Sequence, residues 1–124
     1  MEYKILQHDG FVEVLTVGDA EPSVFQEFVQ EVLRLDKWNP GTPILTNHTE
    51  LNAGPLTISE VHELANIAAT FRAELGRCRM ASLVGRDLEF GLARMWEVFV
   101  EDRWDGETHV FRERADAVDW LLKS

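Results

Sequence analysis

The four histidines are the first candidates for chemistry, because a neutral imidazole can act as a general base or as a metal ligand. They are His8, His48, His62 and His109, of which His48 and His62 fall in neighbouring segments that could converge. A metal site needs three or four ligands, and no two histidines have the i, i+3 or i, i+4 spacing that places a pair on one helix face. Cys78 is the single cysteine, which excludes a cysteine cluster and an intramolecular disulfide. We expect no metal site.

Nucleophilic catalysis would need a serine or cysteine beside a histidine and a carboxylate, often in a Gly-x-Ser-x-Gly turn. Ser23, Ser59 and Ser82 lack that context. A phosphate-binding loop needs several glycines between a strand and a helix, whereas Gly85-Arg86-Asp87 offers one. We therefore expect a protein that is not an enzyme and that uses no cofactor.

Aromatic residues give a stronger indication of binding. One small sheet cannot take every aromatic side chain inward, and surplus aromatics near loops often form an interface or line a pocket. Trp38, beside Asn39-Pro40-Gly41, and Phe90, beside Gly91, fit either ordinary packing or a dimer or ligand surface. Trp96 and Trp120 fit the core.

The charge of the chain excludes one class of partner. The formal net charge is −10, so the domain repels nucleic acid at long range. Five arginines nevertheless fall close together in the sequence, and they form either a local positive patch or a solvated face paired with carboxylates. They are Arg72, Arg77, Arg79, Arg86 and Arg94.

Length and hydropathy favour one cytoplasmic domain over residues 1–124. A chain of 124 residues matches the commonest domain size and has room for one core. No apolar run is long enough to span a bilayer, and the first residues do not resemble a secretory signal.

Hydrophobic spacing predicts the elements that must position these residues. Apolar runs at 2–7 and 11–17 flank Asp9-Gly10, which predicts a β-hairpin. Helical spacing follows Pro22, and short strands are predicted at 43–48, 80–84 and 108–111.

Three further helices complete the prediction. Thr57 stands three residues before Glu60, the capping-box spacing, and Gly76 is placed to close that helix. Another helix follows Gly85-Arg86-Asp87, with Asp87 as its expected cap. Its expected inward side carries Leu88, Leu92, Met95, Trp96 and Phe99. A terminal helix contains Ala115 and Leu121.

The resulting order, β-β-α-β-α-β-α-β-α, predicts an α/β fold with a mixed, mostly parallel sheet, an N-terminal hairpin and helices on both faces. Ligands of such sheets bind where strand ends meet helix starts. We therefore expect a ligand-binding site in which Arg86 faces an anionic group, Asp87 caps its helix, and Phe90 and Trp38 wall an apolar pocket.

With that order, the chain resembles the SpoIIAA-like family, which is grouped with the STAS and SEC14-like folds. The hairpin, the segment from Pro43 through Thr57-Ile58-Ser59-Glu60, and the Ala-x-x-x-Trp-Leu ending carry the resemblance over nearly the whole chain. In the anti-sigma-factor antagonists of this fold, a serine in Asp-Ser-Ser-Gly is phosphorylated at the start of the second helix. The nearest residues here are Thr57 and Ser59, although the motif's Asp and Gly are absent.

The resemblance implies a non-enzymatic binding or regulatory module. Its expected partners are a protein or a small apolar, lipid-like ligand, and it implies peripheral membrane association in some members. We expect a homodimer without a transmembrane segment. The alternative is a phosphorylation-controlled partner switch through Thr57 or Ser59.

Overall fold

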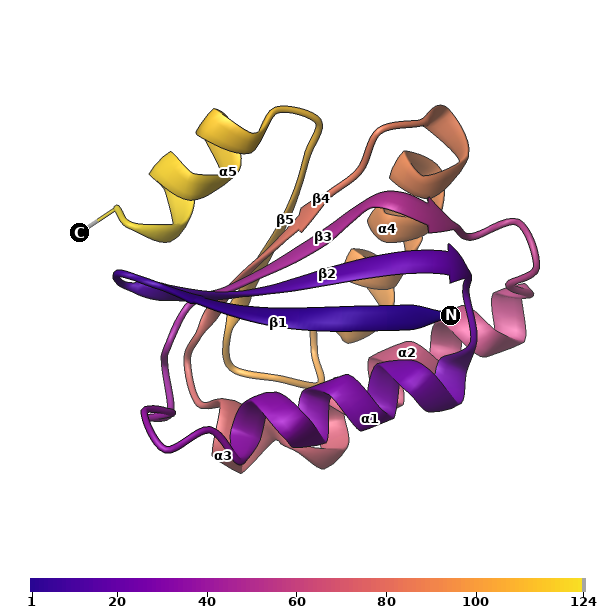
Figure 1. The fold of residues 1–124 in the computed structure, drawn as a ribbon. Coiled ribbons are helices and arrows are strands. Elements are labelled where there is room, and N and C mark those ends of the chain that lie inside the picture. Colours follow the sequence, from indigo (N-terminus) through magenta and orange to yellow (C-terminus); the bar gives the residue numbers. More distant parts are fainter. Residues whose placement is uncertain (124) are drawn as a thin grey trace.

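The computed structural model describes residues 1–123, in which five strands form one sheet and five helices flank it (Figure 1). The strands are β1 (Glu2–His8), β2 (Phe11–Asp19), β3 (Ile44–Asn52), β4 (Arg79–Leu83) and β5 (Glu107–Phe111). The helices are α1 (Pro22–Leu33), α2 (Ile58–Thr70), α3 (Arg72–Leu75), α4 (Asp87–Val100) and α5 (Arg114–Leu121).

The sheet has the strand order β1-β2-β3-β4-β5. β1 and β2 form the predicted antiparallel hairpin, whose turn contains Gly10 at a positive φ of 88°. All other neighbouring strands are parallel. The predicted mixed sheet is therefore confirmed, and the C-terminal ends of β2, β3, β4 and β5 lie at one edge.

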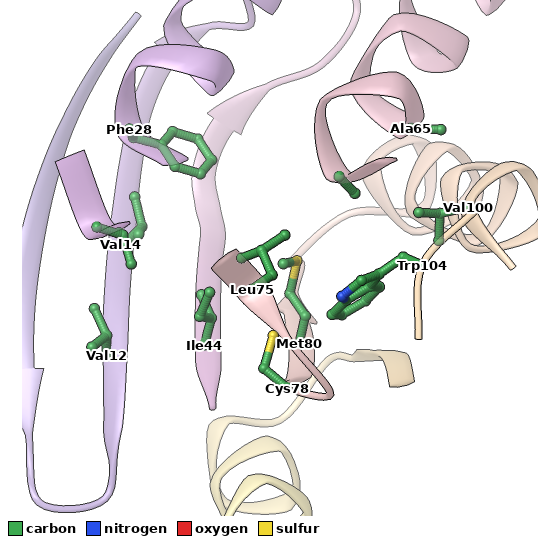
Figure 2. Close-up of a cluster of buried hydrophobic side chains, with 12 residues drawn as sticks. Val12, Val14, Phe28, Ile44, Ala65, Leu75, Cys78, Met80, Val100 and Trp104 are labelled. Carbon is green, nitrogen blue, oxygen red and sulfur yellow. The ribbon is translucent and has the colours of Figure 1, made fainter. Parts of the chain in front are cut away.

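One face of the sheet carries the larger hydrophobic core. Val12 and Val14 of β2, Ile44 of β3 and Met80 of β4 contribute from the strands, since alternate residues of a strand share a face. Figure 2 shows these side chains pointing toward residues of α1, α2, α3 and α4. The helices that cover this face therefore include every helix except α5.

The opposite face packs on α5. Phe11, Leu45, Ala81 and Leu83 meet the small inward face of that helix, and helices thus cover both faces as predicted. The buried carboxylate of Glu13 lies among them. It accepts two hydrogen bonds from Arg114, at 2.7 and 2.9 Å.

Glu13 also contacts His8 at 2.7 Å and accepts from Asn47 at 3.0 Å. The hydrogen bonds from Arg114 outweigh the effect of burial and lower the pKa of Glu13 to about 2. α5 is thus attached at its first residue by a charged pair.

Two details differ from the predicted helices. The helix expected to run from Thr57 to Gly76 is broken at Phe71, which caps both α2 and α3 while its ring packs on the core. In α4, the buried residues are Glu89 and Val100, whereas Leu88, predicted to face inward, is half exposed. Leu92, Trp96 and Phe99 face inward as predicted, so the difference lies in the first turn of α4, where Glu89 is buried in place of Leu88.

Two glycines with opposite surroundings test this packing. Gly91 lies in α4 with open space around its Cα hydrogens, so Gly91→Ala should raise the free energy of unfolding by about 0.5–1 kcal/mol. At Gly106 a Cβ would approach the Trp104 ring at 2.0 Å and the Cys78 carbonyl at 2.4 Å. Gly106→Ala should lower the free energy of unfolding by about 1–3 kcal/mol. Urea unfolding followed by tryptophan fluorescence measures both, and equal effects of the two substitutions would contradict this packing.

Candidate functional site

A cavity of about 110 Å³ lies between the larger core face of the sheet and the helices that cover it. α2 packs chiefly on α1 and α4 rather than on the strands, which leaves space beneath it. The walls of the cavity come from β2, β3, β4, α1, α2, α3, α4 and the loop after β3.

The walls are almost entirely apolar. Phe25, Phe28, Leu64, Leu92 and Trp96 supply the largest surfaces. Apolar spaces of this order accept small apolar molecules; an engineered cavity of about 150 Å³ in another protein binds benzene. The space beneath α2 is therefore suited to a molecule with a single ring or a few carbons.

Four polar or ionisable residues lie on the wall, and two of them are hydroxyl residues on neighbouring strands. Thr46 and Ser82 are paired in the register of β3 and β4, and their hydroxyls hydrogen-bond to each other at 3.3 Å. Thr46 also donates to the Ala81 carbonyl at 3.2 Å. Both hydroxyls therefore have partners within the protein.

Glu89, in the first turn of α4, is the buried carboxylate of the wall. Arg86 donates to its two oxygens at 2.7 and 2.9 Å, and the Ala53 N–H donates at 2.9 Å. Burial acts to raise the pKa of Glu89, but the hydrogen bonds from Arg86 and from the Ala53 N–H outweigh it and lower the pKa. Glu89 is an anion that joins the loop after β3 to the start of α4.

His48, in β3, is the only imidazole on the wall that the described residues provide. Its Nδ1 lies 2.6 Å from the hydroxyl of Thr16, and its ring packs on Phe25 with centroids 5.6 Å apart. Burial lowers the pKa of His48 to about 4, against a smaller opposing effect of Glu89. His48 is therefore neutral at physiological pH.

The structure brings the predicted positions Thr57 and Arg86 to the same edge of the sheet. Thr57 follows β3 and Arg86 follows β4, which are parallel neighbours, and Arg86 reaches the Leu51 carbonyl at 3.4 Å. The charge of Arg86 is already neutralised by Glu89, however. The alternative in which this arginine pairs with a neighbouring carboxylate is the arrangement found.

Asp87 does not cap its helix as predicted. It is the first residue of α4, and its carboxylate accepts a hydrogen bond from Arg112 at 2.7 Å. The cap position is occupied by Arg86, whose side chain makes no capping hydrogen bond. The reason is that the backbone after β4 stays extended only through Arg86 and becomes helical at Asp87, so the helix starts one residue earlier than a cap at Asp87 requires.

The predicted apolar pocket between Phe90 and Trp38 is wrong. Trp38 precedes β3 and donates to the Glu74 carbonyl at 3.0 Å, at the N-terminal edge of the parallel strands. Phe90 follows β4 at the other edge, where the Arg112 guanidinium lies 4.7 Å from its ring centroid. Neither residue lines the cavity.

Thr57 forms the predicted capping box. Its hydroxyl accepts from the Glu60 N–H at 3.1 Å, and Glu60 accepts from the Thr57 N–H at 2.9 Å. Ser59 is exposed on the first turn of α2. Phosphorylation at either residue stays a prediction, and a phosphate on Thr57 would break the capping hydrogen bond.

The remaining candidates have structural surroundings. Cys78 is buried, which raises the pKa of its thiol to about 12, as befits a small core residue. His62 stacks on Phe99 at 3.6 Å and does not line the cavity with His48. Among residues 1–123, no group of three metal-ligating side chains comes together.

Four of the five clustered arginines also have intramolecular partners. Arg72 pairs with Asp105, Arg86 with Glu89 and Arg94 with Glu97, while Arg79 donates to the Trp120 carbonyl. This is the solvated, paired arrangement rather than a free positive patch.

Comparison with known proteins places this geometry in a known fold. No protein-family model and no curated protein matches the sequence. Among solved structures, the chain is similar to an uncharacterised protein of the DUF3478 family from Shewanella loihica PV-4, with a TM-score of 0.63 and 19% sequence identity. The match covers 98% of this chain and 93% of that chain, and that protein has a SpoIIAA-like fold.

This chain has a SpoIIAA-like fold. The resemblance predicted from the hairpin, the capping-box segment and the C-terminal ending is thereby confirmed for the fold. Across residues 1–123 of this SpoIIAA-like domain, none of the helices has the length and apolar character needed to cross a bilayer.

The wall residues His48 and Glu89 were not predicted as site residues. A usable signal existed for His48, since Ile44, Thr46 and His48 alternate along one face of a strand. Glu89 stands seven residues before Trp96, which places both on one side of a helix.

The neutral state of His48 makes the stability of the SpoIIAA-like domain depend on pH. An unfolded histidine has a pKa near 6.5, so between pH 6.5 and 4 the unfolded chain binds a proton that the folded chain does not. The stabilisation is present above pH 6.5 and lost as the pH falls toward 4. His48→Gln should reduce the loss of unfolding free energy between pH 7 and 4.5 by about 1–2 kcal/mol.

Urea unfolding at a series of pH values measures this loss. His62→Gln, which replaces an exposed histidine, is the matched control and should leave the slope unchanged. The same slope in wild type and His48→Gln would show that His48 is not buried as a neutral group.

Proposed function

We propose that this domain is a non-enzymatic binding module that holds a small apolar molecule in the cavity beneath α2. The observation that carries the proposal is the cavity of about 110 Å³ with its almost wholly apolar wall. Burying an apolar ligand there is favoured by about 25 cal/mol for each Å² removed from water.

The side chains around the cavity support binding rather than catalysis. Thr16 hydrogen-bonds to His48, the pairing that nucleophilic catalysis would need, but Thr16 is fully buried and does not line the cavity. The carboxylate of Glu89 is held by Arg86 and the Ala53 N–H. A bound molecule therefore meets no hydroxyl activated by a histidine.

The position of α2 supports a regulatory consequence of binding. Because α2 contacts α1 and α4 more than the strands, a ligand would add the missing contact between this helix and the sheet. Ligand binding would then shift the equilibrium between placements of α2, and a protein partner that contacts α2 could respond.

Filling the cavity tests the proposal. Ala68, on α2, lines the cavity, and Ala68→Leu should place three further carbon atoms in the space. We expect toluene to bind the wild-type protein in an NMR titration and to bind Ala68→Leu at least about tenfold more weakly, since about 1.4 kcal/mol corresponds to tenfold. Ala115→Leu, at an exposed position on α5, is the control and should bind toluene as the wild type does.

A second alanine on the same helix separates cavity filling from overpacking. Ala65 is fully buried but does not line the cavity, so Ala65→Leu should lower the free energy of unfolding by about 1–3 kcal/mol while Ala68→Leu does not. Absence of toluene binding to the wild type would refute the proposal. Native mass spectrometry of the purified protein reports any co-purified molecule, and its subunit count tests the predicted homodimer.

A further inference from the structure

We propose that the molecule held beneath α2 is electrically neutral, has an apolar body the size of one ring, and carries one hydroxyl or N–H that donates a hydrogen bond to Nε2 of His48. The proposal rests on the proposed function and adds the chemical class of the ligand. Phenols and small alcohols belong to this class, whereas carboxylates and hydrocarbons do not.

The hydrogen bonds of Thr16 fix which nitrogen of His48 carries the proton. The Thr16 hydroxyl has one proton, and it lies 3.3 Å from the Asn47 carbonyl, which can only accept, and 2.6 Å from Nδ1 of His48. Both hydrogen bonds form together only if Thr16 donates to the carbonyl and accepts from Nδ1–H. A neutral imidazole protonated at Nδ1 has a lone pair at Nε2, which is therefore an acceptor.

This acceptor is available to a ligand. Within residues 1–123, Nε2 of His48 makes no hydrogen bond, and His48 lines the cavity. The other polar groups of the wall are engaged: Thr46 with Ser82, and Glu89 with Arg86 and the Ala53 N–H. Nε2 is not sealed off from solvent-sized molecules, so a ligand donor can reach it and replace water as its hydrogen-bond partner.

The charges around the cavity disfavour an anionic ligand. Glu89 is ionised on the wall, and none of the described residues that line the cavity is lysine or arginine. Arg86, the nearest cation to Glu89, is already paired with it. A carboxylate beneath α2 would meet like charge without compensation, in addition to its own cost of desolvation.

The size of the cavity limits the apolar body. A space of about 110 Å³ is somewhat smaller than the engineered cavity of about 150 Å³ that holds benzene in another protein. Phenol and toluene are therefore matched probes, because they differ only in a hydroxyl or a methyl group on the same ring.

The test compares phenol, toluene and benzoate in NMR titrations at pH 7.5, with wild type, His48→Phe and His62→Phe. His48→Phe keeps a ring of similar size but has no acceptor. It should weaken phenol binding about tenfold and change toluene binding by less than about threefold, as expected for loss of one buried hydrogen bond. His62→Phe lies outside the cavity and should change neither affinity.

Each of the following results would contradict a specific part of the proposal. If His48→Phe leaves phenol binding unchanged while toluene binds the wild type, the role of His48 is wrong and the proposed function stands. If neither phenol nor toluene binds the wild type, both proposals fail. Benzoate that binds as tightly as phenol would overturn the requirement for a neutral ligand.

A measurement on the wild-type protein makes the test independent of how well His48→Phe folds. The ¹⁵N chemical shifts of the His48 imidazole report which nitrogen is protonated and whether the other accepts a hydrogen bond. We expect Nδ1 to be protonated in the free protein, and the Nε2 signal to shift with phenol but not with toluene. A proton on Nε2 in the free protein would overturn the proposal.

Discussion

The hydrogen bonds of one buried carboxylate hold together the edge of the sheet at which the cavity lies. Glu89 accepts from the Ala53 N–H after β3 and from the Arg86 guanidinium after β4, and Arg86 in turn reaches the Leu51 carbonyl. Ala53 and Glu89 are 36 residues apart in sequence, and these hydrogen bonds tie the loops after β3 and β4 to the first turn of α4. Removing one partner of such a buried group leaves an unpaired charge, which costs several kcal/mol.

The packing of α2 explains how a domain with a dense core retains a space inside it. The strands offer Val14, Ile44 and Met80 to the helices, and α1 and α4 flank them closely. α2 packs on α1 and α4 more than on the strands, and apolar side chains of α2 line the space between this helix and the sheet. A small void lined by apolar groups loses dispersion contacts, and a protein that keeps one carries a destabilising feature with a use for binding.

The sequence predicted the order of elements, the mixed sheet, the hairpin turn at Gly10 and the capping box at Thr57, because each depends on local spacing or on one residue's backbone preference. The break at Phe71 and the burial of Glu89 in place of Leu88 were missed, since both are decided by what the helices pack against. The site was missed for the same reason. Hydrophobic spacing shows that Leu64 faces inward, but it does not show how far that side chain stays from β3.

The residues that were predicted to form the binding site make structural contacts instead. Asp87 and Arg112 pair, Phe90 lies against that arginine, and Trp38 closes the opposite edge through the Glu74 carbonyl. Conversely, the sequence offered His48 only as a possible neighbour of His62. The significance of His48 comes from Thr16 on the neighbouring strand, a partner that is 32 residues away in sequence and that only the register of β2 and β3 reveals.

The attachment of α5 differs in kind from that of the other helices. Few apolar side chains of α5 are buried, and its two ends are held by arginines: Arg114 on Glu13 at the first residue, and Arg79 on the Trp120 and Lys123 carbonyls at the last turn. Ion pairs and charged hydrogen bonds weaken with added salt and with acid, whereas apolar packing does not weaken in the same way. The C-terminal helix is thus the part of the fold whose docking depends most on charged hydrogen bonds, and partial opening of the molecule in strong salt would begin there.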